Sequence, residues 1–353
     1  MSRDLERRYR GVLRLLPGYY RERWEEDMVA AFLDSWLTGD PETDAYIVRV
    51  ARPSWAEVAS VAGLAARLYL GGASTPHRYF AWGQAVRRAV LVLLLLHAAQ
   101  SLAAFLLLAW SRHPAGWLPA LPASLGNVAP GGPWPPVWYA VTSAWIVTYL
   151  ALVLGRYRAA QAIAALAVAA KLAVLLDALL TGRLPLPFGN WGGWVLLGVV
   201  PVLAMTAFHR DAPQAARRPW LLALPAGYLL VFAPMLAVQA TGNSAWLPDL
   251  AGLCCLLAAL ACLAHLPRAW SRRATGSGVW SLTLTLLAAV AGVFRVVSLG
   301  DYLHDPHLIR VGLAELLILT VAVALVGADA VRTQAATPAP PPYPRLDDEA
   351  MGI

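Results

Sequence analysis

Residues 164–180 read AALAVAAKLAVLLDALL, and this stretch decides the class of the fold. A helix needs about 20 apolar residues to cross the bilayer core, and the apolar residues before this stretch extend it to that length. The stretch therefore predicts a membrane-spanning helix with two charged residues inside it, Lys171 and Asp177. Lys171 is also the only lysine among the 28 lysines and arginines of the chain.

The composition of the whole chain agrees with a membrane protein. Hydrophobic residues make up 59% of it and charged residues 14%, whereas a soluble domain carries about 25% charged residues. The net charge of +7 comes from arginines at the ends of apolar runs. Because that is the pattern of membrane topology and gives no basic face, we expect the lipid bilayer as partner and no nucleic acid.

Apolar stretches of spanning length recur along the chain after Arg87. We count eight, and together they predict an all-α, polytopic membrane helix bundle over residues 85–330. The predicted spans are 89–110, 137–155, 159–180, 191–208, 220–240, 247–266, 279–299 and 308–328.

The loops between these stretches predict the orientation of the bundle, since arginine is retained on the cytoplasmic side of a membrane. The loops after the second, fourth and sixth spans are rich in arginine, and the opposite loops hold few. Both termini are therefore expected in the cytoplasm of a multi-pass protein of the cell membrane. The cytoplasmic loops hold Arg156, Arg158, Arg210, Arg217, Arg218, Arg268, Arg272 and Arg273.

The two ends of the chain differ from the bundle. Residues 1–84 carry amphipathic helical patterns and nearly balanced charge, which predicts a small cytoplasmic helical domain. Within it, "GDPETD" (39–44) indicates a break, and Ser54 with Glu57 matches a capping box that opens a helix. Residues 331–353 are polar and proline-rich, which predicts a disordered cytoplasmic tail.

Lys171 lies near the middle of its predicted span, about 18 Å from the inner boundary at ~1.5 Å per residue. A lysine exposed to lipid there costs at least ~2.5–3.5 kcal/mol, so we expect it to face the bundle interior and to have a partner. Asp177 lies about 120° away round the same helix, which favours a partner from another helix.

Two further charges, Arg295 and Glu315, lie at matching depth in the outer parts of the last two spans. The short connection between these spans makes them antiparallel neighbours, so the two side chains are expected to meet. Lys171, Asp177, Arg295 and Glu315 thus form a hypothetical intramembrane charge cluster. Its role is either a substrate pathway or a set of ties between helices.

Motifs for soluble-type catalysis are missing from the sequence: no nucleotide-binding glycine loop, HExxH motif or GxSxG motif is present. We therefore expect no cofactor and no soluble-type enzyme. "GDYLHDPH" (300–307) offers Asp301, His304 and His307 as weak metal-ligand candidates, but Pro306 prevents a regular helix there. His97 is expected to form a hydrogen bond between helices, and three cysteines (254, 255 and 262) to be small buried side chains.

Residues 5–36, "LERRYRGVLRLLPGYYRERWEEDMVAAFLDSW", resemble a short helical prefix that precedes ABC-type permeases and multi-span membrane proteins of unknown function in actinobacteria. The resemblance implies a cytoplasmic helical adaptor in front of a membrane domain. It departs from the permeases themselves, which have four spans and a large outer domain. The matching residues are Tyr9, Arg10, Leu13, Arg14, Leu15, Pro17, Tyr20, Arg21, Arg23, Glu26 and Met28.

Two functions remain open on the sequence. The first is an accessory or sensory membrane protein whose N-terminal helical module binds a cytoplasmic partner. The second is a transporter of a small solute or lipid-like molecule that works through the intramembrane charges. An intramembrane enzyme would need a group of catalytic residues that the sequence does not show.

Overall fold

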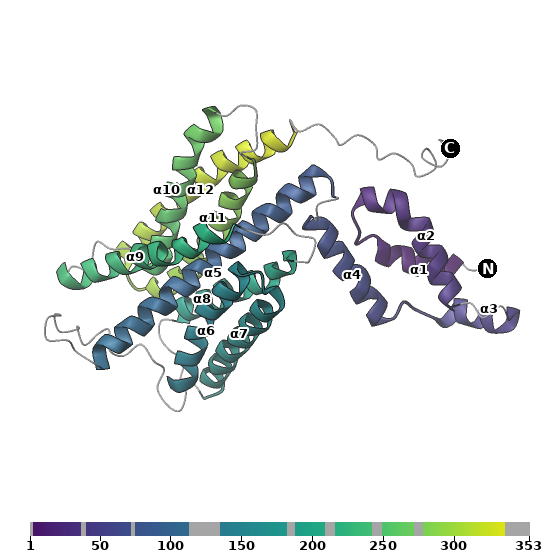
Figure 1. The fold of residues 1–353 in the computed structure, drawn as a ribbon, viewed down its shortest axis with the longest axis horizontal. Coiled ribbons are helices and arrows are strands. Elements are labelled where there is room, and N and C mark those ends of the chain that lie inside the picture. The colour runs from purple at the N-terminus through teal and green to yellow at the C-terminus, as the bar shows by residue number, and fades with distance from the viewer. Residues whose placement is uncertain are drawn as a thin grey trace. The chain divides into compact units, whose positions relative to one another are not determined.

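The computed structural model of the protein is helical throughout the residues that it describes (Figure 1). Its contacts divide the chain into two compact units, one that ends at Gly83 and one that begins at Gln84. Most of the proline-rich loop 111–136 and of the tail lies outside the described residues. The described residues are 3–36, 40–71, 75–112, 135–181, 188–208, 216–241, 249–271 and 278–335.

The first unit holds four short helices, which pack around a core of their own. They are α1 (Arg3–Leu13), α2 (Gly18–Trp36), α3 (Pro41–Val50) and α4 (Trp55–Tyr69). The rings of Tyr9 on α1 and Phe32 on α2 stack face to face, 3.9 Å between centroids. Around this pair the core is closed by Leu5, Leu13, Leu16, Val29, Val61 and Ala65.

Two local signals in this unit mark helix boundaries. The capping box that Ser54 and Glu57 predict is confirmed, with both reciprocal hydrogen bonds at the start of α4. The break predicted at residues 39–44 falls between α2, which ends at Trp36, and α3, which begins at Pro41, but the helix α3 itself was not predicted from the sequence. Asp40 is its N-cap and accepts a hydrogen bond from the backbone N–H of Thr43, and Pro41 stands in the first turn, where proline is well tolerated.

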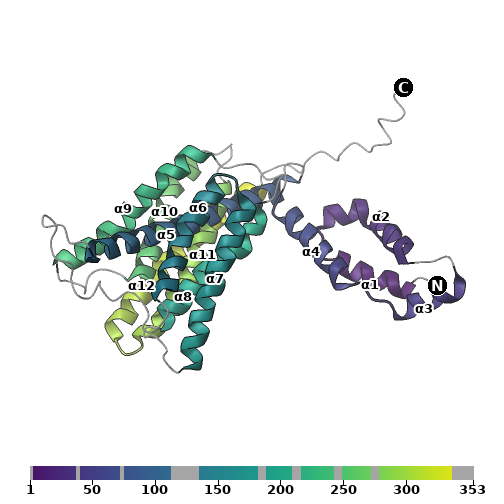
Figure 2. The same cartoon turned by 60° about the horizontal axis from the view of Figure 1, so that its bottom comes forward.

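Eight helices make up the described part of the second unit, each overlapping one predicted span. Their order and neighbours can be followed in Figures 1 and 2. They are α5 (His77–Arg112, its first residues in the first unit), α6 (Pro135–Val153), α7 (Tyr157–Leu180), α8 (Phe188–Ala204), α9 (Arg217–Thr241), α10 (Leu250–Ser271), α11 (Gly278–Leu299) and α12 (Pro306–Ala335).

Five of the described helices are long and apolar enough to cross a membrane. The segments that meet both conditions are His77–Leu106, Tyr157–Asp177, Leu250–Ser271, Gly278–Tyr302 and Pro306–Gln334. Two shorter apolar helical segments, Ala140–Val153 and Val195–Ala207, lie in α6 and α8. The helices therefore have the character of a membrane protein, by length and composition.

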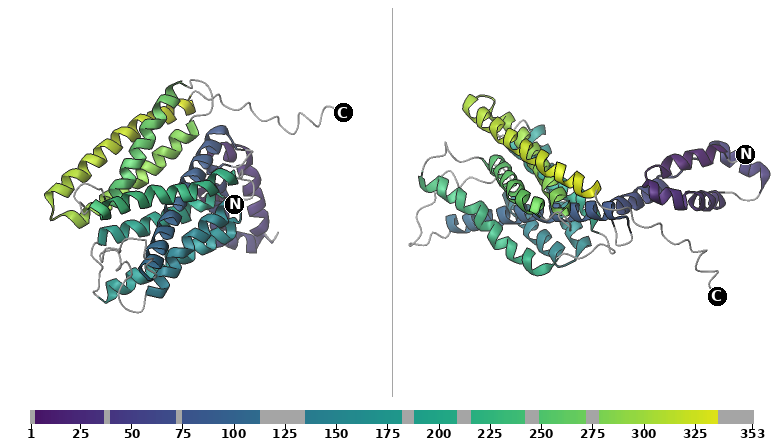
Figure 3. Two further views of the ribbon diagram at one scale, coloured as in Figure 1. Left: turned by 60° about the vertical axis from the view of Figure 1, so that its left-hand side comes forward. Right: turned by 90° about the horizontal axis from the view of Figure 1, so that it is seen from above.

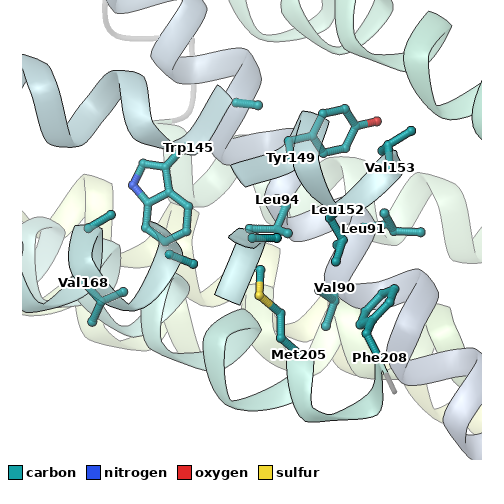
Figure 4. Packing of buried hydrophobic residues seen from close by; sticks show 14 of the residues in the cluster. Val90, Leu91, Leu94, Trp145, Tyr149, Leu152, Val153, Val168, Met205 and Phe208 are labelled. Carbon is teal, nitrogen blue, oxygen red and sulfur yellow. The ribbon is translucent and has the colours of Figure 1, made fainter. Parts of the chain in front are cut away.

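The bundle contains two main groups of packed helices. In one, α10, α11 and α12 pack against one another and lie side by side in Figure 3. In the other, α5, α6 and α7 enclose a core with the end of α8, in which Trp145 and Tyr149 are fully buried (Figure 4). The helix α8 joins the groups, since it packs on both α7 and α11.

The helices α5 and α12 extend furthest beyond the predicted spans. The helix α5 begins at His77, whereas the predicted span begins at 89, so about three further helical turns precede the apolar run. The helix α12 runs to Ala335. Residues 331–335, which the sequence assigns to the disordered tail, are therefore helical.

Candidate functional site

Arg295 on α11 is the centre of a buried ionic network in the second helix group. Its guanidinium Nη1 donates a hydrogen bond to Asp249 Oδ1 at 2.7 Å, and its Nε lies 2.8 Å from Glu315 Oε2 on α12. The Nε–Glu315 contact is an ion pair without hydrogen-bond geometry. Only 4% of the Arg295 side chain and 7% of the Glu315 side chain are exposed, so the network holds charge away from the surface.

Sequence reasoning paired Arg295 with Glu315, as the structure does, and missed Asp249. Asp249 stands directly before α10 and caps it, since its carboxylate accepts a hydrogen bond from the backbone N–H of Gly252 at 2.8 Å. An aspartate just before an apolar helix is a recognised start signal, and it marks this residue in "WLPDLAGL" (246–253). Asp249, Arg295 and Glu315 therefore join the start of α10 to α11 and α12.

Gly312 leaves the space that Arg295 occupies. A Cβ at this position would come within 2.4 Å of Leu299 Cδ2 and 2.9 Å of Arg295 Nη2. A side chain at this position would therefore displace the end of Leu299 or of Arg295 beside the ionic network.

A second polar contact joins α10, α11 and α12 nearer the start of α11. The Ser281 hydroxyl on α11 donates to Asp329 Oδ2 on α12 at 2.6 Å, and His265 Nε2 on α10 lies 3.0 Å from Ser281 Oγ. Because the one hydroxyl proton goes to Asp329, His265 must donate to Ser281. Along α11 this site is about 20 Å from Arg295 at a rise of ~1.5 Å per residue.

Serine, histidine and aspartate also make up a hydrolytic triad, but their arrangement here is different. In a triad the histidine accepts the proton of the serine and the aspartate orients the histidine. Here Ser281 donates directly to Asp329, and Ser281 is fully buried. The geometry is that of a tie between helices.

Lys171 lies in the other helix group, where its ammonium Nζ is 5.4 Å from the centre of the Trp145 ring on α6. Trp145 in turn stacks on His97 of α5, with ring centroids 4.4 Å apart. The predicted interhelical hydrogen bond of His97 is confirmed, since its Nε2 donates to the backbone carbonyl of Leu197 on α8 at 3.0 Å. The three side chains thus link four helices.

Of the four residues in the hypothetical charge cluster, the structure brings two together. Arg295 and Glu315 are in contact, whereas the contact described for Lys171 is aromatic and lies between α6 and α7. Asp177 is half-buried on α7, and its backbone carbonyl accepts a hydrogen bond from Thr181 Oγ1. A joint role of all four in one polar zone stays a hypothesis.

The metal-ligand candidates lie in and beside the connection between α11 and α12. His304 and His307 are exposed and Asp301 is half-buried, while the neighbouring Asp305 caps α12 by accepting from the backbone N–H of His307. Among the described residues, no three histidine, cysteine or acidic side chains come together as a metal site.

An apolar cavity of about 240 Å³ lies in the bundle among α5, α8, α9, α10 and α11. Its floor includes the buried side chains of Leu93, Leu197 and Phe294. Cys254 lines it, and Cys255 and Cys262 are buried, all three as free thiols. The prediction that the cysteines are small buried side chains is thus confirmed for Cys255 and Cys262, while Cys254 is half-buried in the cavity wall.

Outside the bundle, the first unit has an ionic network at its surface. Arg10 on α1 makes a two-pronged contact with Glu26 on α2, at 2.9 and 2.8 Å, and also binds Glu6 and Glu25. The hydrogen bonds to Arg10 lower the pKa of the exposed Glu26 carboxyl below its usual value. Arg10 and Glu26, with Tyr9 and Leu13 in the core, therefore pack α1 against α2.

Large apolar side chains are exposed on the same unit. Trp55, the first residue of α4, is 88% exposed, and Tyr46 and Val50 on α3 are 68% and 55% exposed. Tyr46 and Val50 are one helical turn apart and share a face of α3. Tryptophan and tyrosine are the side chains that contribute most often to protein–protein binding.

Comparison of the chain with protein-family models, with curated proteins and with solved structures found no match.

Proposed function

We propose that the protein is an accessory or sensory component of the cell membrane, whose N-terminal module binds a cytoplasmic protein partner. In this proposal all eight helices α5–α12 cross the bilayer, and both termini lie in the cytoplasm. The arginine-rich loops after α6, α8 and α10 support this orientation.

The observation that carries the proposal is the exposed apolar surface of a unit that already has a complete core. Leu5, Leu13 and Leu16 are fully buried within the unit, so Trp55 and Tyr46 are not needed to close it. Such side chains at the surface are typical of a binding site. We expect the partner to cover Tyr46, Val50 and Trp55.

The ionic contacts of the bundle favour this role over the transport of a polar solute. Arg295 is paired with two carboxylates, and Lys171 lies over an aromatic ring. The cavity is lined by apolar side chains among the described residues. Charges that bind one another between helices serve as ties, whereas a solute pathway needs charges directed into a polar cavity.

Site-specific photo-crosslinking in the full chain tests the partner-binding role. A photoreactive residue at position 55 is expected to capture one protein. The same protein should no longer co-purify with the chain when Trp55 is changed to Ala. The control is Ser60, which is also exposed but lies about 140° round α4 from Trp55. Equal capture at positions 55 and 60, or capture of lipid alone, contradicts the proposal.

A comparison of two variants in cells separates the accessory role from transport. If the module binds the partner, deletion of residues 1–80 abolishes the cellular phenotype and Lys171→Met leaves it largely intact. The reverse result, loss with Lys171→Met and no effect of the deletion, supports a transporter that works through the intramembrane charges.

A further inference from the structure

The apolar cavity begins one helical turn after Arg88 on α5, and no acidic partner of Arg88 is found among the described residues. The cavity is lined along one face of α5 by Val92, Leu95 and Ala99. Arg88 precedes Val92 by one helical turn, so it lies on the same face. Its guanidinium lies over the ring of Trp280 on α11, 4.6 Å from the centroid.

On α11, too, the residue at the end of the groove lies on the same helix face as the residues that line it. Trp280 is followed on one face by Leu284, Leu287, Ala291 and Phe294, all of which line the cavity. The ring of Trp280 is 43% exposed. An arginine and a tryptophan therefore mark one end of an apolar groove that two helices continue, and such a pair is typical of the membrane–water interface.

The groove has the depth of one bilayer leaflet. Along α5 its lining runs from about 6 Å to about 16 Å beyond Arg88, at a rise of ~1.5 Å per residue. Half of the hydrocarbon core measures about 15 Å. A molecule with a charged group at Arg88 and an apolar chain in the groove would therefore occupy its normal depth in the membrane.

The groove is open on the side of α9 and α10. Leu230 and Ala261 line it and are exposed, whereas Leu93 and Phe294 at its floor are buried. Since these helices are apolar on their exposed sides, lipid has lateral access. The volume of about 240 Å³ exceeds the roughly 150 Å³ that is enough for a benzene-sized ligand in a dry cavity.

Arg88 retains the donors that a phosphate requires. A guanidinium stacks on an aromatic ring through its flat face, which leaves the N–H groups at its edge free to bind a phosphate in a two-pronged manner. Basic pockets between membrane helices bind anionic lipid headgroups in this way. The neighbouring Arg87 is committed elsewhere, because its Nη1 donates to the carbonyl of Ala207.

We propose that the groove among α5, α9, α10 and α11 binds one anionic phospholipid, with its phosphate on Arg88 and an acyl chain in the cavity. Trp280 positions the guanidinium, and the cavity accepts the chain from the side of α9 and α10. A zwitterionic phospholipid would bind more weakly, because its headgroup cation offsets the charge of the phosphate that Arg88 binds.

Native mass spectrometry of the delipidated full chain tests the site with two phospholipids of identical acyl chains. The wild-type protein is expected to retain one phosphatidylglycerol about tenfold more tightly than phosphatidylcholine, because the choline ammonium of phosphatidylcholine repels the Arg88 guanidinium and offsets the charge of the phosphate. Equal retention of the two lipids, or of neither, overturns the proposal without the use of any variant.

Variants then separate the two halves of the site. Arg88→Gln is expected to reduce phosphatidylglycerol retention to the level of phosphatidylcholine, and Ala258→Phe, which fills the groove, to reduce both. The matched controls are Arg158→Gln and Ala165→Phe on exposed positions of α7. Variants that behave like their controls overturn the proposal, as does complete displacement of the lipid by inorganic phosphate alone.

Discussion

Arg10 and Arg295 are each bound by two or more carboxylates, but their surroundings are opposite. Arg10 is 31% exposed, and its partner Glu26 is 81% exposed. Arg295 is 4% exposed and joins three helices of the bundle. In water an ion pair adds little stability, whereas loss of one partner from a buried pair leaves an uncompensated charge. The same chemistry therefore orders a surface in one unit and is required for packing in the other.

The largest effect is expected from Arg295→Met. This change leaves the buried Glu315 carboxylate and the half-buried Asp249 carboxylate without their shared cation, so the bundle should lose about 3–5 kcal/mol of stability. Unfolding of the purified protein in detergent measures the loss. Arg310→Met is the matched control, because Arg310 is exposed on α12. Equal stability of the two variants would mean that the buried network does not hold the helices.

A methyl group at Gly312 should disturb the same network from the opposite side. Gly312→Ala forces Arg295 or Leu299 to move, which typically costs about 1–3 kcal/mol. The control is Gly292→Ala on α11, where the new Cβ would lie 3.5 Å from Leu319, an ordinary contact. If both variants are as stable as the wild type, the space between α11 and α12 at Gly312 can accept a methyl group, which contradicts the prediction.

Loss of the Ser281 contact is expected to cost less stability than Arg295→Met. Ser281→Ala removes the hydroxyl between His265 and Asp329 and should destabilise the bundle by about 1–3 kcal/mol, since both partners lose a hydrogen bond. Thermal unfolding followed by circular dichroism provides the measurement. Ser271→Ala, at the exposed end of α10, is the control, and a loss as large in the control contradicts a special role for Ser281.

The smallest effect is expected at the surface network, and it depends on pH. Arg10 lowers the pKa of Glu26 from its usual 4.5, so the folded unit binds that proton less readily than the unfolded chain. The stabilisation is therefore full above pH 4.5 and is lost as the pH falls through the lowered pKa. Glu26→Gln should remove this part of the acid sensitivity and change stability little at pH 7. An unchanged acid profile in the variant would contradict the assignment.

Much of the fold could be predicted because the pattern of apolar residues is unambiguous. Each of the helices α5–α12 overlaps a predicted span, since a helix that faces lipid needs a long apolar run. Short local structure was predicted less completely. Residues 39–44 were predicted as a break, but Asp40 as N-cap and Pro41 in the first turn also start the helix α3, which was not predicted from the sequence.

The candidate site was predictable only in part. Arg295 and Glu315 could be paired from the sequence because they lie at matching depth in the last two helices, whose register the short connection fixes. Matching of depths did not identify Asp249, because this residue caps α10 and is not part of a regular helical pattern. Nor could it identify Trp145 as the neighbour of Lys171, since the rotation of α6 about its axis depends on packing of the whole bundle.

Reporter fusions along the chain test the central claim most directly: eight helices cross the membrane and the module and tail share the cytoplasm. Fusions within residues 1–40, 209–215, 272–277 and 336–353 are expected to report the cytoplasm. Fusions within 113–134 and 242–248 are expected to report the opposite side. A module on the outer side, or an odd number of crossings, would contradict the account.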